Sequence, residues 1–69
     1  MKQYNKYYQT SVSLTFIGKV VLTEQEYAHA VNMPVHGGNS FIYVEPKDDK
    51  YQEHLIDGKM SIEQYNSIK

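Results

Sequence analysis

The chain has 69 residues, a formal net charge of −1 and seven tyrosines, but it contains no arginine, cysteine or tryptophan. The length predicts one small domain over residues 1–69, and the missing cysteines exclude disulfides and thiolate metal sites. The missing arginines remove the side chain that most often clamps phosphate groups. The composition therefore favours contact with proteins over contact with nucleic acid.

The N-terminal third is predicted to form two strands. Residues 1–6 are polar, and we expect them to be frayed. Residues 7–17 alternate between apolar and polar side chains, which is typical of a strand with one buried face, here the face that includes Tyr8. A tight turn at Gly18-Lys19 then leads into a second strand over residues 20–22.

A helix is predicted over residues 24–32. Thr23 and Glu26 have the spacing of a capping box, in which each side chain accepts a hydrogen bond from the other residue's backbone amide. The proline and glycines of residues 34–39 then predict a loop, and a third strand follows over residues 41–45.

The C-terminal part allows two interpretations. Residues 51–57 form a short helix that ends at Gly58, or Asp57 and Gly58 form the turn of a hairpin. Ser61 and Gln64 have the spacing of a second capping box, which predicts a final short helix. The complete prediction is an α+β fold, with a small antiparallel three-stranded sheet of order β-β-α-β and one or two short C-terminal helices.

No pattern in the sequence predicts catalysis, a cofactor or a metal. His29, His36 and His54 lack the compact spacing of metal ligands, and the sequence contains neither a nucleophile elbow nor a phosphate-binding loop. We therefore expect no catalytic residues, no metal and no cofactor, and we predict that the protein is not an enzyme. The polar start and the lack of a long apolar run predict a cytoplasmic protein.

The tyrosines are the candidate contact residues. Three of them lie where the predicted helices and strands would bury them at least in part: Tyr27, Tyr43 and Tyr65. Three others have no such packing role: Tyr4, Tyr7 and Tyr51. Because clusters of exposed aromatic side chains often mark interfaces, the second group is the better candidate for a binding surface.

Residues 18–27, GKVVLTEQEY, resemble a pattern of very small phage proteins, in which a strand and a Gly-Lys turn lead to a capped helix and a further strand. The phage-encoded inhibitors of uracil-DNA glycosylase are similar in their β-β-α-β order, and the resemblance covers residues 12–45. It implies a dimer in which an acid and aromatic residues on and near the helix engage the DNA-binding groove of an enzyme. The matching positions here are Glu26 and Tyr27, with Glu24 as a further candidate.

The chain departs from these inhibitors by continuing well beyond the third strand. Residues 55–65 resemble instead the helix-turn-helix of short oligomerisation modules. Such a short chain buries a small core, so we expect a homodimer or a tight complex with another protein.

Together these features predict a small protein-protein interaction module, encoded by a phage or mobile element, that inhibits or modulates a host protein by occupying its surface. The candidate target is a DNA-processing or defence enzyme. The predicted partner-binding residues are Tyr4, Tyr7, Glu24, Glu26, Tyr27 and Tyr51. One alternative is a nucleic-acid-binding regulator, in which the N-terminal tyrosines stack bases and neighbouring lysines contact the phosphate backbone. The only such mixture of aromatic and basic residues is Tyr4, Tyr7 and Tyr8 with Lys2 and Lys6. The other is a structural assembly subunit.

Overall fold

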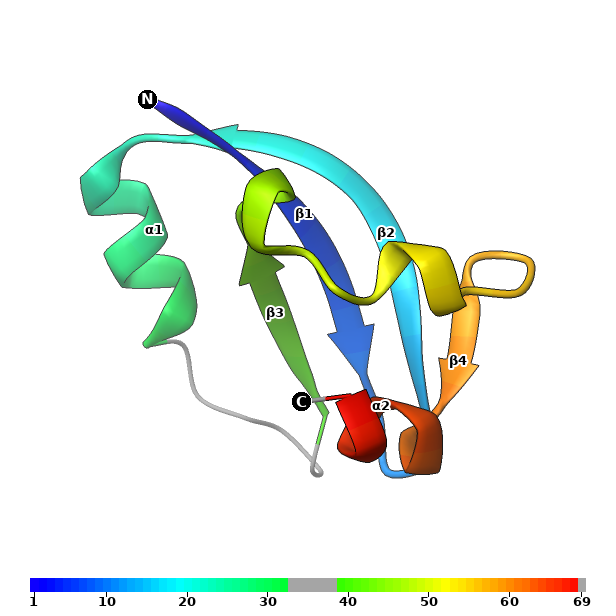
Figure 1. Cartoon of the computed structure of the whole chain (residues 1–69). Helices are drawn as coiled ribbons and strands as arrows, with labels where there is room; N and C mark the ends of the chain where they lie inside the picture. Colours follow the sequence, from blue (N-terminus) through cyan, green and yellow to red (C-terminus); the bar gives the residue numbers. More distant parts are fainter. Residues whose placement is uncertain (33–38, 69) are drawn as a thin grey trace.

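The computed structural model describes residues 1–32 and 39–68 and has an α+β fold (Figure 1). In these residues four strands form one antiparallel sheet in the order β3-β1-β2-β4: β1 (Lys2–Gln9), β2 (Ser13–Leu22), β3 (Ser40–Val44) and β4 (Lys59–Ser61). The helices are α1 (Glu24–Val31), α2 (Ile62–Ile68) and two single 3-10 turns, η1 (Pro46–Asp48) and η2 (Gln52–His54). The α+β class agrees with the sequence prediction, whereas the predicted three-stranded sheet lacks one strand.

The first hairpin turns at residues 10–12, within the segment 7–17 that the sequence predicts as one strand. The Thr10 hydroxyl accepts hydrogen bonds from the backbone amides of Val12 (3.2 Å) and Ser13 (3.1 Å). The Thr10 amide donates to the Ser13 carbonyl at 2.9 Å. A threonine side chain thus builds this turn without glycine or proline, so the alternating pattern gives no sign of it.

The polar N-terminus belongs to the sheet and is not a frayed end. β1 is a central strand, which pairs with β2 from Lys2 to Gln9 and with β3 from Asn5 to Gln9. Within residues 1–6, Lys2 to Tyr4 pair with β2 alone, and Asn5 and Lys6 pair on both sides. The structure therefore differs from the prediction that residues 1–6 are frayed.

β2 runs through Gly18 without turning, so the tight turn predicted there is wrong. Lys6 pairs with Gly18 and Tyr7 pairs with Phe16, which leaves Ile17 as the extra residue of a β-bulge. Gly18 has a φ angle of 152°, a backbone conformation that residues with a Cβ atom rarely adopt. The glycine therefore bends a strand and does not end it.

The bulge allows β2 to contribute apolar residues to both faces of the sheet. Before the bulge, Leu14 and Phe16 lie on the same face as Tyr7, whereas beyond it Val20 pairs with Tyr4 on the opposite face. A regular strand would place Leu14, Phe16 and Val20 on one side, because its side chains alternate with a period of two.

The core lies on one face of the sheet, beneath the C-terminal segment. Its buried residues are Tyr7, Leu14, Met60 and Tyr65. Seven partly buried side chains pack against them: Phe16, Ile42, Val44, Tyr51, Leu55, Ile62 and Ile68. Figure 1 shows η1, η2 and α2 on this side of the sheet. We call it the core face and call the opposite side, where Tyr4 stacks on α1, the helix face.

α1 begins as the sequence predicts. The Thr23 hydroxyl accepts a hydrogen bond from the Glu26 amide (3.1 Å), and the Glu26 carboxylate accepts one from the Thr23 amide (2.8 Å), which completes the capping box. The helix ends at Val31, close to the predicted end. Apart from Asn39, the predicted loop over residues 34–39 lies outside the described residues.

Of the two interpretations of residues 51–57, the hairpin is confirmed. Asp57 (φ 54°) and Gly58 (φ 76°) occupy the two positive-φ positions of a type I′ turn, and Ile56 pairs with Lys59 across it. The returning strand, β4, is the strand absent from the prediction. The helical interpretation is correct only for the single turn η2.

α2 follows β4 directly. The Ser61 hydroxyl accepts a hydrogen bond from the Gln64 amide at 3.2 Å, which is one of the two bonds of the predicted capping box. No helix within residues 1–32 and 39–68 has the length and apolar character needed to cross a membrane.

Candidate partner-binding groove

Two of the predicted contact tyrosines lie in the interior of the molecule. Tyr7 is 0% exposed and Tyr4 is 7% exposed, so the expectation that they form an exposed cluster is wrong. Both belong to the central strand β1, which is covered on each face. Tyr51 is partly buried, with its ring centroid 5.8 Å from that of Tyr7 and 5.3 Å from that of Tyr65, and it therefore completes the core.

A polar cluster fastens the C-terminal segment to β1. The Tyr7 hydroxyl (2.5 Å) and the Asn5 Nδ2 group (2.7 Å) both donate to Asp49 Oδ2, and Gln52 Nε2 donates to the Tyr7 oxygen at 2.9 Å. The other Asp49 oxygen accepts from the backbone amides of Tyr51 (2.8 Å) and Gln52 (3.3 Å). These donors are directed inward, so the cluster is structural.

The pKa values of the two central groups reflect this packing. Burial by itself raises the pKa of Asp49, but the hydrogen bonds from Tyr7 and Asn5 outweigh it and hold the pKa below its ordinary value. Burial, followed by the bond to Asp49, raises the pKa of the Tyr7 hydroxyl. At neutral pH an ionised carboxylate therefore accepts from a neutral phenol.

Partly exposed tyrosine rings lie on the helix face. Tyr27 of α1 stacks on Tyr4 with ring centroids 4.6 Å apart and ring planes within 10° of parallel. Tyr43 of β3 meets Tyr27 edge-on, at 6.4 Å. Tyr43 is partly buried as predicted, and Tyr27, for which the sequence predicts a core position, is also only partly buried. The three rings form an aromatic wall that joins β1, α1 and β3.

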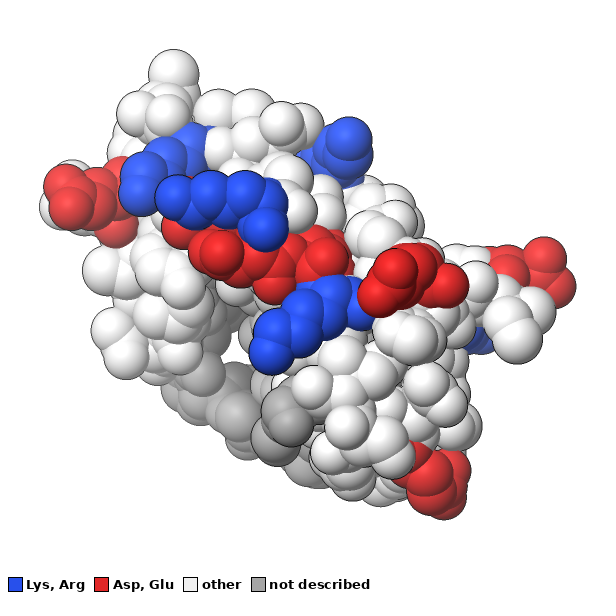
Figure 2. Space-filling view, in the orientation of Figure 1, with Lys and Arg blue, Asp and Glu red and all other residues white. Residues whose placement is uncertain are grey.

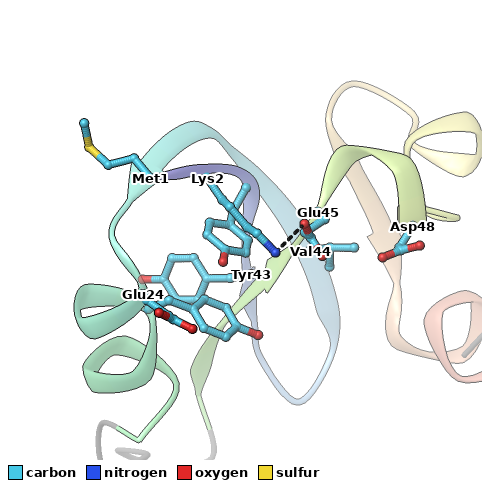
Figure 3. Close-up of a pocket in the computed structure, with 9 residues that line it drawn as sticks. Met1, Lys2, Glu24, Tyr43, Val44, Glu45 and Asp48 are labelled. Carbon is cyan, nitrogen blue, oxygen red and sulfur yellow. Dashed lines mark ion pairs between the residues drawn. The ribbon is translucent and has the colours of Figure 1, made fainter.

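These rings line a groove of about 600 Å³, which we call the tyrosine groove (Figure 3). Three carboxylates line it as well, Glu24 from α1, Glu45 after β3 and Asp48 from η1. Lys2 contributes a positive charge, with its Nζ atom 3.5 Å from a Glu45 carboxylate oxygen. Figure 3 shows Glu24 on the α1 side and Asp48 on the η1 side of the groove, with Tyr43 and Lys2 between them.

Three of the four charged side chains that line the groove are acidic. Lys2 pairs with Glu45, whereas within residues 1–32 and 39–68 no ion pair joins Glu24 or Asp48 to a cation. Both of these carboxylates are exposed. On the face shown in Figure 2, acidic side chains gather over η1 and lysines flank them. Aromatic rings and unpaired carboxylates in one groove attract cations.

The helix residues singled out by the sequence have separate roles. Glu24 and Tyr27 line the groove, together with Tyr4 from β1. Glu26 is engaged in the capping box instead, where the hydrogen bond from the Thr23 backbone lowers the pKa of its carboxyl. Glu24 is therefore the acid of α1 that lines the groove.

A second aromatic cluster lies on the helix face. The Lys6 Nζ atom is 4.3 Å from the ring centroid of Phe41 and 5.6 Å from that of Tyr43, and the ring of Tyr8 is 5.1 Å from that of Phe41. Phe41 is 45% exposed. The sheet thus separates the N-terminal residues that the sequence shows as one cluster: Tyr7 points to the core face, while Lys6 and Tyr8 point to the helix face.

Six lining residues are absent from the sequence-based prediction of the contact surface: Met1, Lys2, Tyr43, Val44, Glu45 and Asp48. Tyr43, Val44 and Glu45 belong to the strand predicted over residues 41–45. Met1 and Lys2 lie in the polar N-terminal end, and Asp48 lies in the charged segment that follows the strand. They meet because antiparallel pairing of β3 with β1 places Val44 opposite Asn5, which brings the end of β3 beside the start of β1. No local pattern indicates this juxtaposition.

The histidines are dispersed. His29 and His54 are exposed on α1 and η2, and His36 lies outside the described residues. In the part of the chain that the structure describes, no group of three or more histidine, aspartate or glutamate residues could hold a metal ion.

Comparison with models of protein families, with curated proteins and with solved structures found no match to this chain. Its function is therefore inferred from the tyrosine groove itself.

Proposed function

We propose that this protein is a small protein-binding module that uses the tyrosine groove to occupy a basic surface of a partner protein. The observation that carries the proposal is the presence of three tyrosine rings and three carboxylates, with Lys2 as their counter-charge, in one groove. Tyrosine provides large contact area at a small cost in conformational entropy, and charges around such an area set orientation and association rate.

The charge of the groove suggests the class of partner. Proteins that act on nucleic acid expose lysine and arginine side chains that contact phosphate groups, and an acidic groove is complementary to the same surface. We propose that the partner is a host enzyme that processes DNA or defends against foreign DNA, and that the chain, encoded by a phage or mobile element, blocks it. The origin of the chain is supported by the sequence resemblance alone.

A capture experiment with charge-reversed variants tests this function. The tagged wild-type chain, a Glu24→Lys/Asp48→Lys variant and a Glu53→Lys/Glu63→Lys control would be incubated with lysate of a candidate host. All four substituted side chains are exposed, and the two variants have the same net charge. We expect the wild type and the control to retain one stoichiometric partner, and the groove variant to lose it.

The captured partner would then be assayed with and without the wild-type chain. We expect its activity to fall with the wild type and to be unaffected by the groove variant. Retention of the same proteins by all three chains, or no stoichiometric partner for the wild type, contradicts the proposed function.

A nucleic-acid-binding regulator is the second candidate, favoured by the cluster of Lys6, Tyr8 and Phe41. Exposed rings can stack bases while a neighbouring lysine contacts phosphate. Fluorescence anisotropy of labelled single-stranded DNA at low salt tests it. This candidate requires binding that weakens with added salt and with Phe41→Ser, and unchanged anisotropy at low salt removes it.

The homodimer predicted from the small size of the chain is a separate proposal. β4 pairs only with residues 13–15 of β2, and Ile17 and Val21 are exposed further along that strand. The outer edge of β2 is therefore the place where a second copy would add strands. Sedimentation equilibrium of the wild type and Val21→Lys tests it, and a monomer at all wild-type concentrations would overturn it.

A further inference from the structure

We propose that the tyrosine groove receives a single arginine side chain from the partner, and that this arginine displaces Lys2 from Glu45. The inference rests on the proposed function, because it names the side chain that the partner inserts.

The aromatic wall suits a planar cation. Tyr27 and Tyr4 are almost parallel, and Tyr43 stands at 81° to Tyr27, so the rings form a corner. A guanidinium group can lie flat on the face of one ring while its N–H donors point outward in its own plane. It is also more weakly hydrated than an ammonium group, so it enters a partly enclosed groove at lower cost.

Glu24 and Asp48 are the candidate acceptors for those donors, because both line the groove. They come from different elements and lie on two sides of the groove (Figure 3). Both are exposed, and the described residues provide neither with an ion-pair partner. A guanidinium has five N–H donors in a fixed plane, so it can bond to more than one carboxylate, whereas an ammonium is a compact point charge.

Lys2 is an internal competitor for the groove. Its Nζ atom is 3.5 Å from Glu45, and its side chain is 65% exposed. An exposed ion pair of this kind contributes little, so a cation with better contacts can replace it. The chain contains no arginine, so none of its own residues can fill the groove with a guanidinium. Removing the Lys2 charge should therefore strengthen the binding of an external cation.

The test is a titration of the ¹⁵N-labelled chain with three capped tripeptides, followed by two-dimensional NMR. The peptides are acetyl-Gly-Arg-Gly-amide, its lysine counterpart and its citrulline counterpart, which has nearly the shape of arginine but no charge. We expect saturable shifts of the groove amides with the arginine peptide, with a dissociation constant of about 1–10 mM. Binding of the citrulline peptide should be about five- to tenfold weaker.

Three variants locate the binding. Glu24→Gln/Asp48→Asn should weaken binding of the arginine peptide by about fivefold or more, and Lys2→Gln should strengthen it by about two- to threefold. Glu53→Gln/Glu63→Gln removes two carboxylates elsewhere and should leave it unchanged. The expected gain with Lys2→Gln keeps the test decisive if the first variant folds poorly.

The inference is overturned if citrulline binds as well as arginine, if lysine binds more tightly, if the shifts lie outside the groove, or if the groove variants behave as the control does. Failure here is distinguishable from failure of the proposed function. Partner capture that depends on Glu24 and Asp48 without arginine-peptide binding refutes only the arginine inference. Arginine-peptide binding without a captured partner refutes the partner-binding function.

Discussion

The core face and the helix face of the sheet are both rich in tyrosine, but they use it differently. On the core face Tyr7 is fully buried, and its hydroxyl donates a hydrogen bond to Asp49, an acceptor within the chain. On the helix face Tyr27 and Tyr43 remain partly exposed and line a groove with carboxylates. The difference follows from what covers each face: the C-terminal segment encloses the first, whereas α1 covers only part of the second. Tyrosine content alone therefore does not distinguish a core from a contact surface.

The largest difference between the two regions should appear when a ring is removed from each. Tyr7→Ala should lower the free energy of unfolding by about 3–5 kcal/mol, because it empties the centre of the core. Tyr27→Ala removes a stacked but partly exposed ring and should cost about 1–2 kcal/mol. Urea unfolding followed by circular dichroism measures both. Equal losses would show that the groove tyrosines belong to the core.

The polar cluster on the core face should make stability depend on pH. Asp49→Asn should lower the free energy of unfolding at neutral pH by about 1–3 kcal/mol, because hydrogen bonds to a charged acceptor are lost. The folded pKa of Asp49 lies below its ordinary value of 3.8, so its ionised form stabilises the fold above that pH. This contribution disappears as the pH falls through the folded pKa. The difference between wild type and variant should therefore shrink in urea titrations below about pH 4, and a constant difference would contradict it.

The bulge that serves both faces should give a smaller effect. Gly18→Ala should lower the free energy of unfolding by about 1–2 kcal/mol, because a Cβ atom disfavours the φ angle of 152°. No atom lies within 4 Å of the added Cβ, so the cost comes from the backbone alone. Lys19→Ala, at the next residue, should change it by less than about 0.5 kcal/mol. If Gly18→Ala leaves the free energy of unfolding unchanged, the strand adjusts to the alanine and the positive φ angle at this position is not required.

The smallest effect on stability is expected for the groove carboxylates. Glu24→Gln/Asp48→Asn should change the free energy of unfolding by less than about 0.5 kcal/mol, because both side chains are exposed and no ion pair among the described residues depends on them. Chemical unfolding of this variant beside wild type measures the change. A loss above about 1 kcal/mol would assign these acids to the fold and not to a binding surface.

The features predicted correctly are those that neighbouring residues determine together. Thr23 and Glu26 complete their capping box, Ser61 caps α2, and Asp57-Gly58 makes the hairpin that was one of two interpretations. In each case the residues that form the cap or the turn are only a few positions apart in the sequence. The turn at Thr10 is equally local, but a threonine hydroxyl in an alternating segment gives a much weaker signal than glycine or proline.

The candidate site was only partly predictable for a different reason. The resemblance to phage inhibitors pointed to Tyr27 and Glu24, but Tyr43, Glu45 and Asp48 join them through the pairing of β3 with β1. The placement of Tyr4 and Tyr7 depends on β1 being central, which requires two partners far away in sequence. The pairing register of strands that are far apart in the sequence cannot be predicted from a short stretch of residues.

The sequence by itself thus determined the α+β class, the start of each α-helix and the absence of arginine. The tertiary structure alone decided which tyrosines are covered. Tyr4 and Tyr7 are buried because β1 is a central strand with a covering layer on each face, and the bulge at Gly18 lets β2 place apolar residues on both faces. The groove exists because that sheet brings α1, η1 and the start of β1 together, which is a property of long-range register and not of any local pattern.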